Sequence, residues 1–340
     1  MPEMTTAQLD FSGGSLILAR PGTGDPTLRA WDAADELLLE EAICAAAALG
    51  EPRVLVVDDQ FGALSLGLAA LSPTVVADSA VLPAALAHNA SLNPEVTPPE
   101  SVFSWINAPE GPFDLVVLRI PRQADYLAWL LRWLNRVMAD SGVLLAGGMI
   151  KHLPARSVDV FAEAVRTEQV LPARKKARVI RCNRGAATLA DWSATWKGYR
   201  LGDRKGDVGI EALPAVFARE KLDIGTRLML PHVVNEVSTA RAGDSVLDLA
   251  CGNGVLGLAA LSERRDLQLV FSDVSSQAVL SARRNVEKAF PDAKAAFSHR
   301  DGIESDPGAF DLILLNPRST RVVWSVITSH FGYSSRRRNT

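Results

Sequence analysis

Apolar runs that end in small or polar residues recur along this chain. The clearest covers residues 246–249 and leads into Ala-Cys-Gly-Asn-Gly at 250–254; two further runs cover 269–273 and 310–315. Strands of a buried parallel sheet have continuous apolar sequences, and their carboxyl ends open onto ligand crevices in α/β folds. The pattern predicts a doubly wound α/β sheet in the second half of the chain, with a ligand site at its carboxyl edge.

The first half repeats this pattern. Apolar segments at 54–57, 75–77 and 113–118 come in the same order, and both halves contain the strings Phe-Asp-Leu and Leu-Ala-Ala-Leu. Strands and helical stretches that alternate at this spacing predict βαβ units. We interpret the chain as two tandem Rossmann-like domains, 1–190 and 191–340, related by duplication. Convergence of two unrelated Rossmann-like domains is the alternative.

Composition narrows the class of protein. The chain has 340 residues, 48% of them hydrophobic, and no apolar run long enough to cross a bilayer. Its first residues lack the features of a signal peptide, so we expect a soluble, cytoplasmic protein. The three cysteines have no metal-ligand spacing, which argues against a zinc site or a disulfide framework. The net charge of −3 gives no global attraction to nucleic acid, so any RNA contact must be local.

The glycine-containing turn predicts a cofactor pocket for S-adenosylmethionine. Gly252 and Gly254 allow close backbone approach, and the following helix offers free amides to a carboxylate. An acidic residue at the end of the next strand is placed to bind ribose hydroxyls. The form Asp-x-x-x-Gly-x-Gly favours this cofactor over a dinucleotide; a tight turn without a ligand is the alternative. The candidate cofactor residues are Asp248, Gly252, Asn253, Gly254, Asp273, Val274 and Asp301.

Asn316 and Pro317 follow the strand-like run 310–315 and are the candidate catalytic residues. The lone pair of an exocyclic amine is delocalised into its ring, so an enzyme must orient the amine before methyl transfer. The Asn316 amide oxygen and a neighbouring carbonyl can accept both amine hydrogens, and Pro317 stiffens the loop. An ordinary Asn-Pro turn is the alternative.

The first half lacks these groups. Bulky Gln60 and Phe61 precede its single turn glycine, and Arg119 stands where Asn316 stands in the second half. We therefore expect a degenerate copy that binds no cofactor and has a structural or RNA-holding role.

These residues carry a family resemblance. The second half resembles class I methyltransferases with an Asn-Pro-Pro-aromatic loop, and segment 213–227 resembles bacterial ribosomal RNA guanine-N2 methyltransferases of the duplicated-domain type. Segments 30–39, 61–64 and 173–178 are more similar to the large-subunit (23S) type than to the small-subunit (16S) type. The resemblance covers residues 16 to 317. It implies methylation of a guanine N2 amine in 23S rRNA, with S-adenosylmethionine as cofactor and ribosomal RNA as partner.

Basic residues near the end of the first half and upstream of the pocket are candidates for binding RNA phosphates. They are Arg174, Lys175, Lys176, Arg178, Arg219 and Lys221. A solvated, charged edge strand explains the first four equally well. Three other functions stay open: a 16S rRNA guanine-N2 enzyme, another Asn-Pro-loop methyltransferase that acts on protein glutamine or adenine, and a non-catalytic RNA-binding remnant.

The sequence departs from the family pattern after Pro317. Arg318 replaces the second proline, and the segment 318–340 ends in a run of arginines rather than a helix and further strands. A neighbouring reading frame, with one restored base, can encode Asn-Pro-Pro-Phe followed by an amphipathic helix. We therefore expect a catalytic domain that is truncated after about residue 317 through a frameshift, and an inactive polypeptide.

Overall fold

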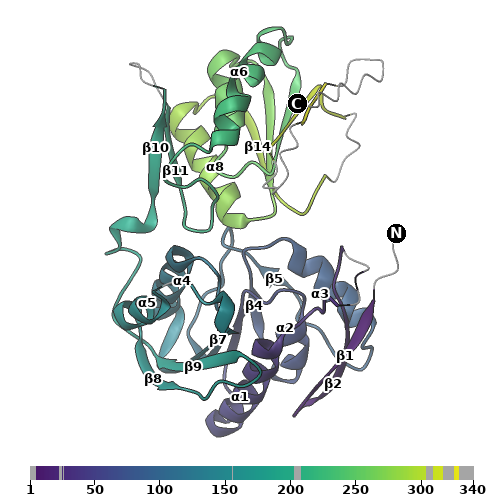
Figure 1. The fold of residues 1–340 in the computed structure, drawn as a ribbon, viewed down its shortest axis with the longest axis vertical. Helices are drawn as coiled ribbons and strands as arrows, with labels where there is room; N and C mark the ends of the chain where they lie inside the picture. Colours follow the sequence, from purple (N-terminus) through teal and green to yellow (C-terminus); the bar gives the residue numbers. More distant parts are fainter. Residues whose placement is uncertain are drawn as a thin grey trace. The chain divides into compact units, whose positions relative to one another are not determined.

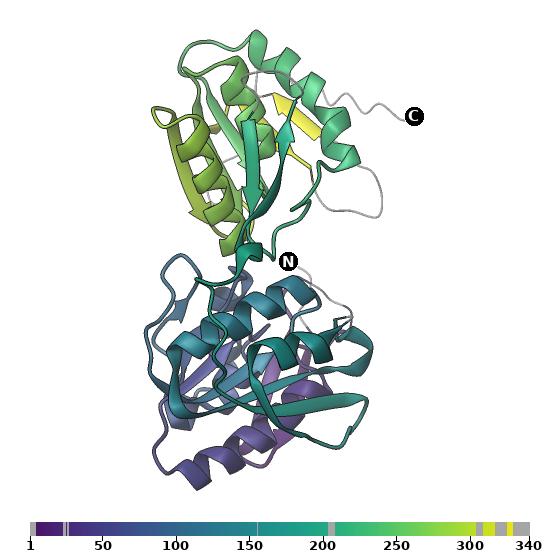
Figure 2. The same cartoon turned by 90° about the vertical axis from the view of Figure 1, so that its left-hand side faces the viewer.

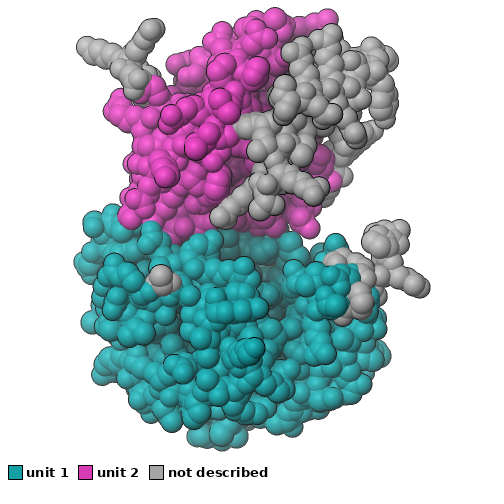
Figure 3. All heavy atoms as spheres, viewed as in Figure 1, with its two compact units in different colours: residues 1–195 teal, residues 196–340 magenta. Residues whose placement is uncertain are grey.

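The chain folds into two units, Met1–Thr195 and Trp196–Thr340 (Figure 3), and each has its own sheet (Figure 1). The computed structural model describes residues 5–22, 25, 27–154, 156–202, 208–303 and 309–316, and the backbone of 325–328. Within these residues, none of the helices has the length and apolar composition that a membrane span requires.

The first unit contains a seven-stranded sheet with the order β5-β4-β3-β6-β7-β9-β8. The first five of these strands are mutually parallel, whereas β9 is antiparallel to both β7 and β8. A hairpin of β1 and β2 precedes the sheet. The strands are β1 (Thr6–Phe11), β2 (Gly14–Ala19), β3 (Val54–Val57), β4 (Thr74–Val76), β5 (Val102–Phe103), β6 (Phe113–Arg119), β7 (Met138–Met149), β8 (Arg166–Val170) and β9 (Ala177–Asn183).

The first helix of the first unit starts from a local signal. Helix α1 begins with a capping box, in which the Asp32 carboxylate accepts from the Ala34 amide and Asp35 accepts from the Asp32 amide. Trp105, Tyr126 and Trp129 pack edge-on or stacked in a buried aromatic cluster. The helices are α1 (Ala33–Leu49), α2 (Ala63–Gly67), α3 (Val81–Ser91), α4 (Ala124–Val137) and α5 (Ser157–Ala164), with short 3-10 turns η1 (Ala69–Leu71) and η2 (Ile150–His152).

The second unit has a five-stranded sheet with the order β14-β13-β12-β15-β16, in which β16 alone is antiparallel to its neighbour. A hairpin of β10 and β11 precedes it, and β11 packs against α8 (Figure 2). The elements are the 3-10 turn η3 (Ser193–Thr195) at the unit boundary, then β10 (Lys197–Leu201), β11 (Val208–Ala212), α6 (Ile224–Ser238), β12 (Ser245–Leu249), α7 (Val255–Glu263), β13 (Gln268–Asp273), α8 (Ser276–Ala289), β14 (Lys294–His299), β15 (Leu312–Leu315) and β16 (Ser325–Thr328).

The α/β class predicted from the sequence is confirmed, although both sheets are mixed rather than wholly parallel. The two units share four parallel strands in the same spatial order, β5-β4-β3-β6 and β14-β13-β12-β15. They also share a hydrogen bond at the amino end of the central strand: Asp114 accepts from the Arg53 amide at 2.9 Å, and Asp311 accepts from the Ser245 amide at 2.8 Å. Equivalent strands therefore begin in the same way in both units.

Candidate active site

The candidate residues of the second unit meet at the carboxyl edge of its sheet. Strand β12 lies between β13 and β15, and Leu249 is in register with Ser272 on one side and Leu315 on the other. The turn 250–254, the end of β13 and Asn316 are therefore neighbours. This is the edge at which open α/β sheets bind ligands.

The turn 250–254 is shaped by backbone conformations that favour glycine. Gly252 and Gly254 have φ angles of +56° and +79°, and Ala250 also lies in the left-handed region at +55°. A Cβ atom at Gly254 would come within 3.0 Å of the Ala282 Cβ on α8, so this glycine is required for packing. At Gly252, by contrast, no described atom lies within 4 Å of the Cβ position. A ligand can therefore reach the Gly252 backbone.

Asp248 lies beneath this turn rather than at its surface. Only 1% of the residue is exposed, and its Oδ2 accepts from the Gly257 amide at 2.9 Å. Gly257 is the third residue of α7, so Asp248 satisfies one of the free amides at the start of that helix. Burial raises the pKa of Asp248 to about 8, with a further contribution from the Asp273 charge. Asp248 thus supports the turn, in addition to any contact with a ligand.

Asp273 and its neighbours define the next part of the site. The Asp273 Oδ2 accepts from the Gly252 amide at 2.8 Å, and Oδ1 accepts from the Ser275 amide at 2.9 Å. A carboxylate oxygen has two lone pairs, so both oxygens can still accept from ribose hydroxyls. Val274 is 38% exposed and Asp301 is exposed beyond β14, which leaves both accessible.

Asn316 is held by helix α6. Its Nδ2 donates to the Thr226 hydroxyl at 2.8 Å, and the Thr226 amide donates in turn to Asp223, the N-cap of α6, at 3.0 Å. In this arrangement the amide nitrogen of Asn316 already donates a hydrogen bond to Thr226. Its amide oxygen is left as the acceptor for a substrate amine. The sequence analysis did not identify Thr226 and Asp223 as residues of the site, although Asp-x-x-Thr is a recognisable helix start. Pro317 lies outside the described residues.

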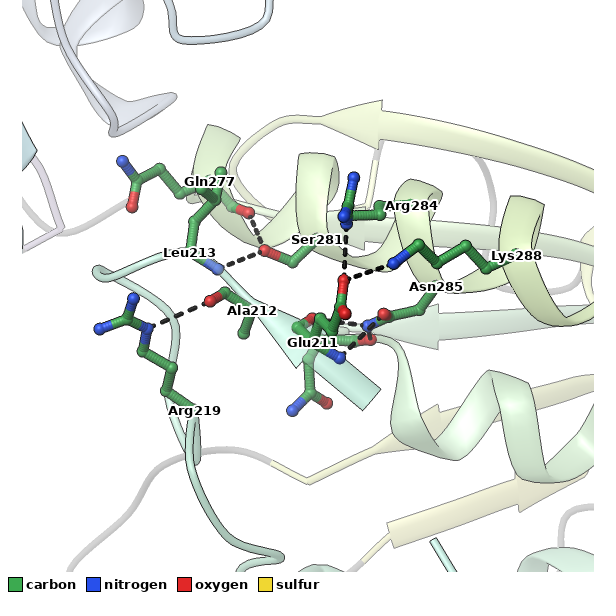
Figure 4. A network of polar contacts seen from close by, with 10 residues as sticks. Glu211, Ala212, Leu213, Arg219, Gln277, Ser281, Arg284, Asn285 and Lys288 are labelled. Atoms are coloured by element: carbon green, nitrogen blue, oxygen red, sulfur yellow. Dashed lines mark hydrogen bonds and ion pairs between the residues drawn. The ribbon is translucent and has the colours of Figure 1, made fainter. Parts of the chain in front are cut away.

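A polar row on α8 attaches the segment 211–215 to this site (Figure 4). Ser281 accepts from the Leu213 amide at 3.0 Å, and Gln277 accepts from the Ala215 amide at 2.8 Å. Asn285 contacts the backbone of Glu211, whose carboxylate accepts from Lys288 and Arg284; these hydrogen bonds lower the pKa of Glu211. Sequence reasoning missed this row, because each partner lies more than sixty residues away.

The predicted RNA contacts have varied environments. Arg174 and Lys175 form ion pairs with Glu40 and Glu36 of α1. The Arg178 Nε is buried and has no hydrogen-bond partner among the described residues. Lys176 and Lys221 are exposed.

Arg219 requires a correction. We expected an exposed cation near the pocket, but the residue is 7% exposed and its Nε donates to the Ala212 carbonyl at 3.1 Å (Figure 4). Its side chain folds back against β11 and braces the loop that follows. The guanidinium is thus part of the wall of the unit rather than of an open basic surface.

The corresponding edge of the first unit has a different chemistry. At the position of Asn316, Arg119 is 7% exposed and pairs with Asp32 at 3.0 Å and Asp35 at 3.2 Å. Burial raises the pKa of Asp58 to about 7, with a further contribution from Asp78. Arg119 is thus neutralised by two acidic partners, whereas Asp58 is a buried carboxyl beside a second acidic residue. In the described residues, no cluster of three or more His, Cys, Asp or Glu could hold a metal ion.

Comparison with known proteins places the chain in a family. Residues 6–186 match the RLMG N-terminal domain, and residues 207–328 match the methyltransferase small domain. The ribosomal RNA large subunit methyltransferase G of Alcanivorax borkumensis is 35% identical over 313 residues, which cover 89% of this chain and 78% of the relative. The chain belongs to the ribosomal RNA large subunit methyltransferase G family.

Two further similarities support this family assignment and the fold. The Stutzerimonas stutzeri member is also 35% identical, over 91% of this chain and 81% of its own length. A solved structure of the T. thermophilus 16S rRNA N2 G1207 methyltransferase, in complex with AdoMet and guanosine, superposes with a TM-score of 0.66. At 22% identity, over 92% of this chain and 80% of the other, this likeness shows that the fold is shared.

Proposed function

We propose that the chain transfers the methyl group of S-adenosylmethionine to the N2 amine of a guanine in 23S rRNA. Membership of the family makes it an S-adenosylmethionine-dependent methyltransferase. The observation that carries the finer proposal is the position of Asn316, whose amide is held by Thr226 beside the glycine turn at one sheet edge. A guanine N2 amine is a planar donor of two hydrogens, which suits an amide acceptor.

The residues of the second unit fit this cofactor. The accessible backbone at Gly252 and the start of α7 would hold its carboxylate, and Asp273 would bind the ribose hydroxyls. The cofactor supplies an electrophilic methyl group on a sulfonium. Val274 and Asp301 would lie beside the adenine.

Asn316 would orient the amine. Its oxygen accepts one amine hydrogen, and a backbone carbonyl of the same loop accepts the other, so that the nitrogen lone pair points toward the methyl carbon. The positive charge that develops on the amine in the transition state strengthens both hydrogen bonds. The hydrogen bond to Thr226 prevents rotation of the amide during this step.

We further propose that the first unit, over residues 1–190, is a degenerate duplicate of the catalytic domain that begins near residue 191. The shared strand order and the matching carboxylate caps at Asp114 and Asp311 support this relationship. Its charged groups at Asp58 and Arg119 leave no equivalent of the cofactor turn or of the amide. Its role is then structural or in holding RNA.

Three exposed cations of the first unit are the residues that would bind RNA phosphates. Arg122, Lys151 and Lys176 are exposed, and their side chains have no ion pair or hydrogen bond with the described part of the chain. Strand pairing brings their segments together, because Ile120 donates to the Gly147 carbonyl at 2.8 Å and Ile150 donates to the Lys176 carbonyl at 2.9 Å. Unpaired cations can neutralise RNA phosphates without first breaking an ion pair.

The test is methyl transfer from tritiated S-adenosylmethionine to purified 23S rRNA, 16S rRNA and total cell protein. With a full-length version whose reading frame is restored after the Asn316 codon, we expect label in 23S rRNA alone, at the N2 position of a guanine, and its loss in Asn316→Ala with cofactor binding retained. Label in 16S rRNA, in adenine or in protein would refute the proposed substrate and support the corresponding alternative.

The hypothesis of a frameshift after Asn316 stays a prediction. Beyond residue 316 the structure describes only Ser325–Thr328, the strand β16 that pairs with β15, whereas residues 317–324 and 329–340 lie outside the described part of the chain. Sequencing the gene beyond the Asn316 codon tests it directly: an in-frame continuation that encodes a helix and further strands is expected. Robust methylation by the 340-residue form would contradict the expected inactivity.

A further inference from the structure

One buried side chain joins three parts of the second unit. Asn285 of α8 is fully buried, and its Oδ1 accepts from the Glu211 amide at 2.9 Å. Its Nδ2 donates to the Glu211 carbonyl at 2.8 Å and to the Asn253 carbonyl at 2.9 Å (Figure 4). The amide thereby links strand β11, helix α8 and the middle residue of the glycine turn.

The turn depends on this link because Asn253 is itself 3% exposed. A buried carbonyl that loses its donor keeps the cost of its desolvation. The Asn253 side chain does not replace this donor, because its Nδ2 donates elsewhere, to the Tyr199 hydroxyl at 3.2 Å and to the Ala218 carbonyl at 3.5 Å. Asn285 is therefore the principal support of the carbonyl between Gly252 and Gly254.

The first unit contains the same arrangement. Asn89 of α3 accepts from the Ala19 amide at 2.8 Å and donates to the Ala19 carbonyl at 3.1 Å. Its Nδ2 also donates to the Phe61 carbonyl at 2.7 Å, and Phe61 precedes Gly62 as Asn253 precedes Gly254. The first unit thus has the link without the open glycine turn, and it provides an internal control.

We propose that Asn285 is a positioning residue for the cofactor: it holds the Asn253 carbonyl and so fixes the backbone from Gly252 to Gly254 in its binding conformation. This inference rests on the proposed function, because it assumes that the turn binds S-adenosylmethionine. It predicts that the same substitution has different consequences in the two units. Both variants lose a structural link, but only the change at Asn285 weakens cofactor binding.

The experiment compares Asn285→Ala with Asn89→Ala in the full chain. Calorimetric titration with S-adenosylmethionine and S-adenosylhomocysteine should show affinity lowered about tenfold by Asn285→Ala, equivalent to about 1.4 kcal/mol. Asn89→Ala should keep the affinity within about twofold, although both variants should melt at lower temperature. A folded Asn285→Ala protein with unchanged affinity would overturn the proposal.

Hydrogen exchange of the free protein gives a second readout that needs no cofactor. Asn285→Ala should speed exchange in peptides that contain 250–254, and Asn89→Ala should speed it in those that contain 59–63. If Asn285→Ala does not fold, Asn285→Ser, which can keep one hydrogen bond, replaces it in both measurements. Unchanged exchange at 250–254 would also refute the role of Asn285. Failure of the unmodified chain to bind either ligand would instead refute the proposed function. The exchange data would then still test whether Asn285 holds the turn at 250–254.

Discussion

Asp248→Asn should make the chain more stable, and increasingly so as the pH rises from 5 to 7. The carboxyl group is 1% exposed and has a pKa of about 8 in the folded chain, against an ordinary value of 3.8. Between these two values the folded state binds a proton that the unfolded state releases. Its contribution to stability therefore falls as the pH rises through this window, by about 1.4 kcal/mol per pH unit.

From pH 5 to pH 7 the wild-type chain should thus lose about 3 kcal/mol through this group, whereas the Asp248→Asn variant loses nothing at this site. The amide oxygen of the introduced side chain can still accept from the Gly257 amide, so the support of α7 is retained. Urea unfolding followed by far-ultraviolet circular dichroism at each pH measures the difference between variant and wild type. Taking this difference removes the contributions of other titrating groups.

Asp58→Asn in the first unit is the matched control. The pKa of Asp58 is raised to about 7 by burial, so the stabilisation by Asp58→Asn should level off about one pH unit earlier than that by Asp248→Asn. A difference for Asp248→Asn that stays constant from pH 5 to 7 would refute the reasoning. It would mean that Asp248 is ionised in the folded chain, and that the turn is wetter than the structure shows.

The other predictions concern the site and the exposed cations of the first unit that are proposed to bind RNA. In a full-length version of the protein, Asn316→Ala should lower the methylation rate about a hundredfold, with cofactor affinity within about threefold, because the amide acts mainly in the transition state; an unchanged single-turnover rate would remove it from the mechanism. Thr226→Val should lower the same rate less, by about tenfold, since the amide remains but can rotate. Gly252→Val should weaken calorimetric cofactor binding by more than tenfold, because the left-handed φ of +56° disfavours valine and the side chain would enter the ligand space. Arg122→Glu should weaken binding of 23S rRNA fragments and reduce its salt dependence, whereas Arg174→Glu, which removes a cation already paired with Glu40, should have a smaller effect; equal effects would contradict the proposed role of Arg122.

The sequence predicted those parts of the site that follow from local pattern. Runs such as 246–249 located the strands, and the endings of these runs located the turn at Gly252 and Gly254. Because neighbouring parallel strands end at one edge, these endings also predicted that Asn316 lies near the turn.

The remaining errors and omissions are non-local. The exposure of Arg219 could not be read from its neighbours, since its partner is the Ala212 carbonyl at the end of the hairpin. The ion pair of Arg174 with Glu40 spans 134 positions. Charge patterns identify cations but not which of them are already paired, so the cations proposed to bind RNA could be chosen only with the structure.

The two units separate the requirements of the fold from those of the chemistry. Asn89 and Asn285 occupy equivalent places and make equivalent bonds, so this link serves the architecture whether or not a ligand binds. The residues that differ are those at the open edge. Arg119 is buried and pairs with both Asp32 and Asp35, so its charge is neutralised within the first unit, and removal of Arg119 would leave the buried Asp35 without its cation. At the same position Asn316 is neutral, tethered on one side and free to accept on the other, which is the condition that orienting an amine requires.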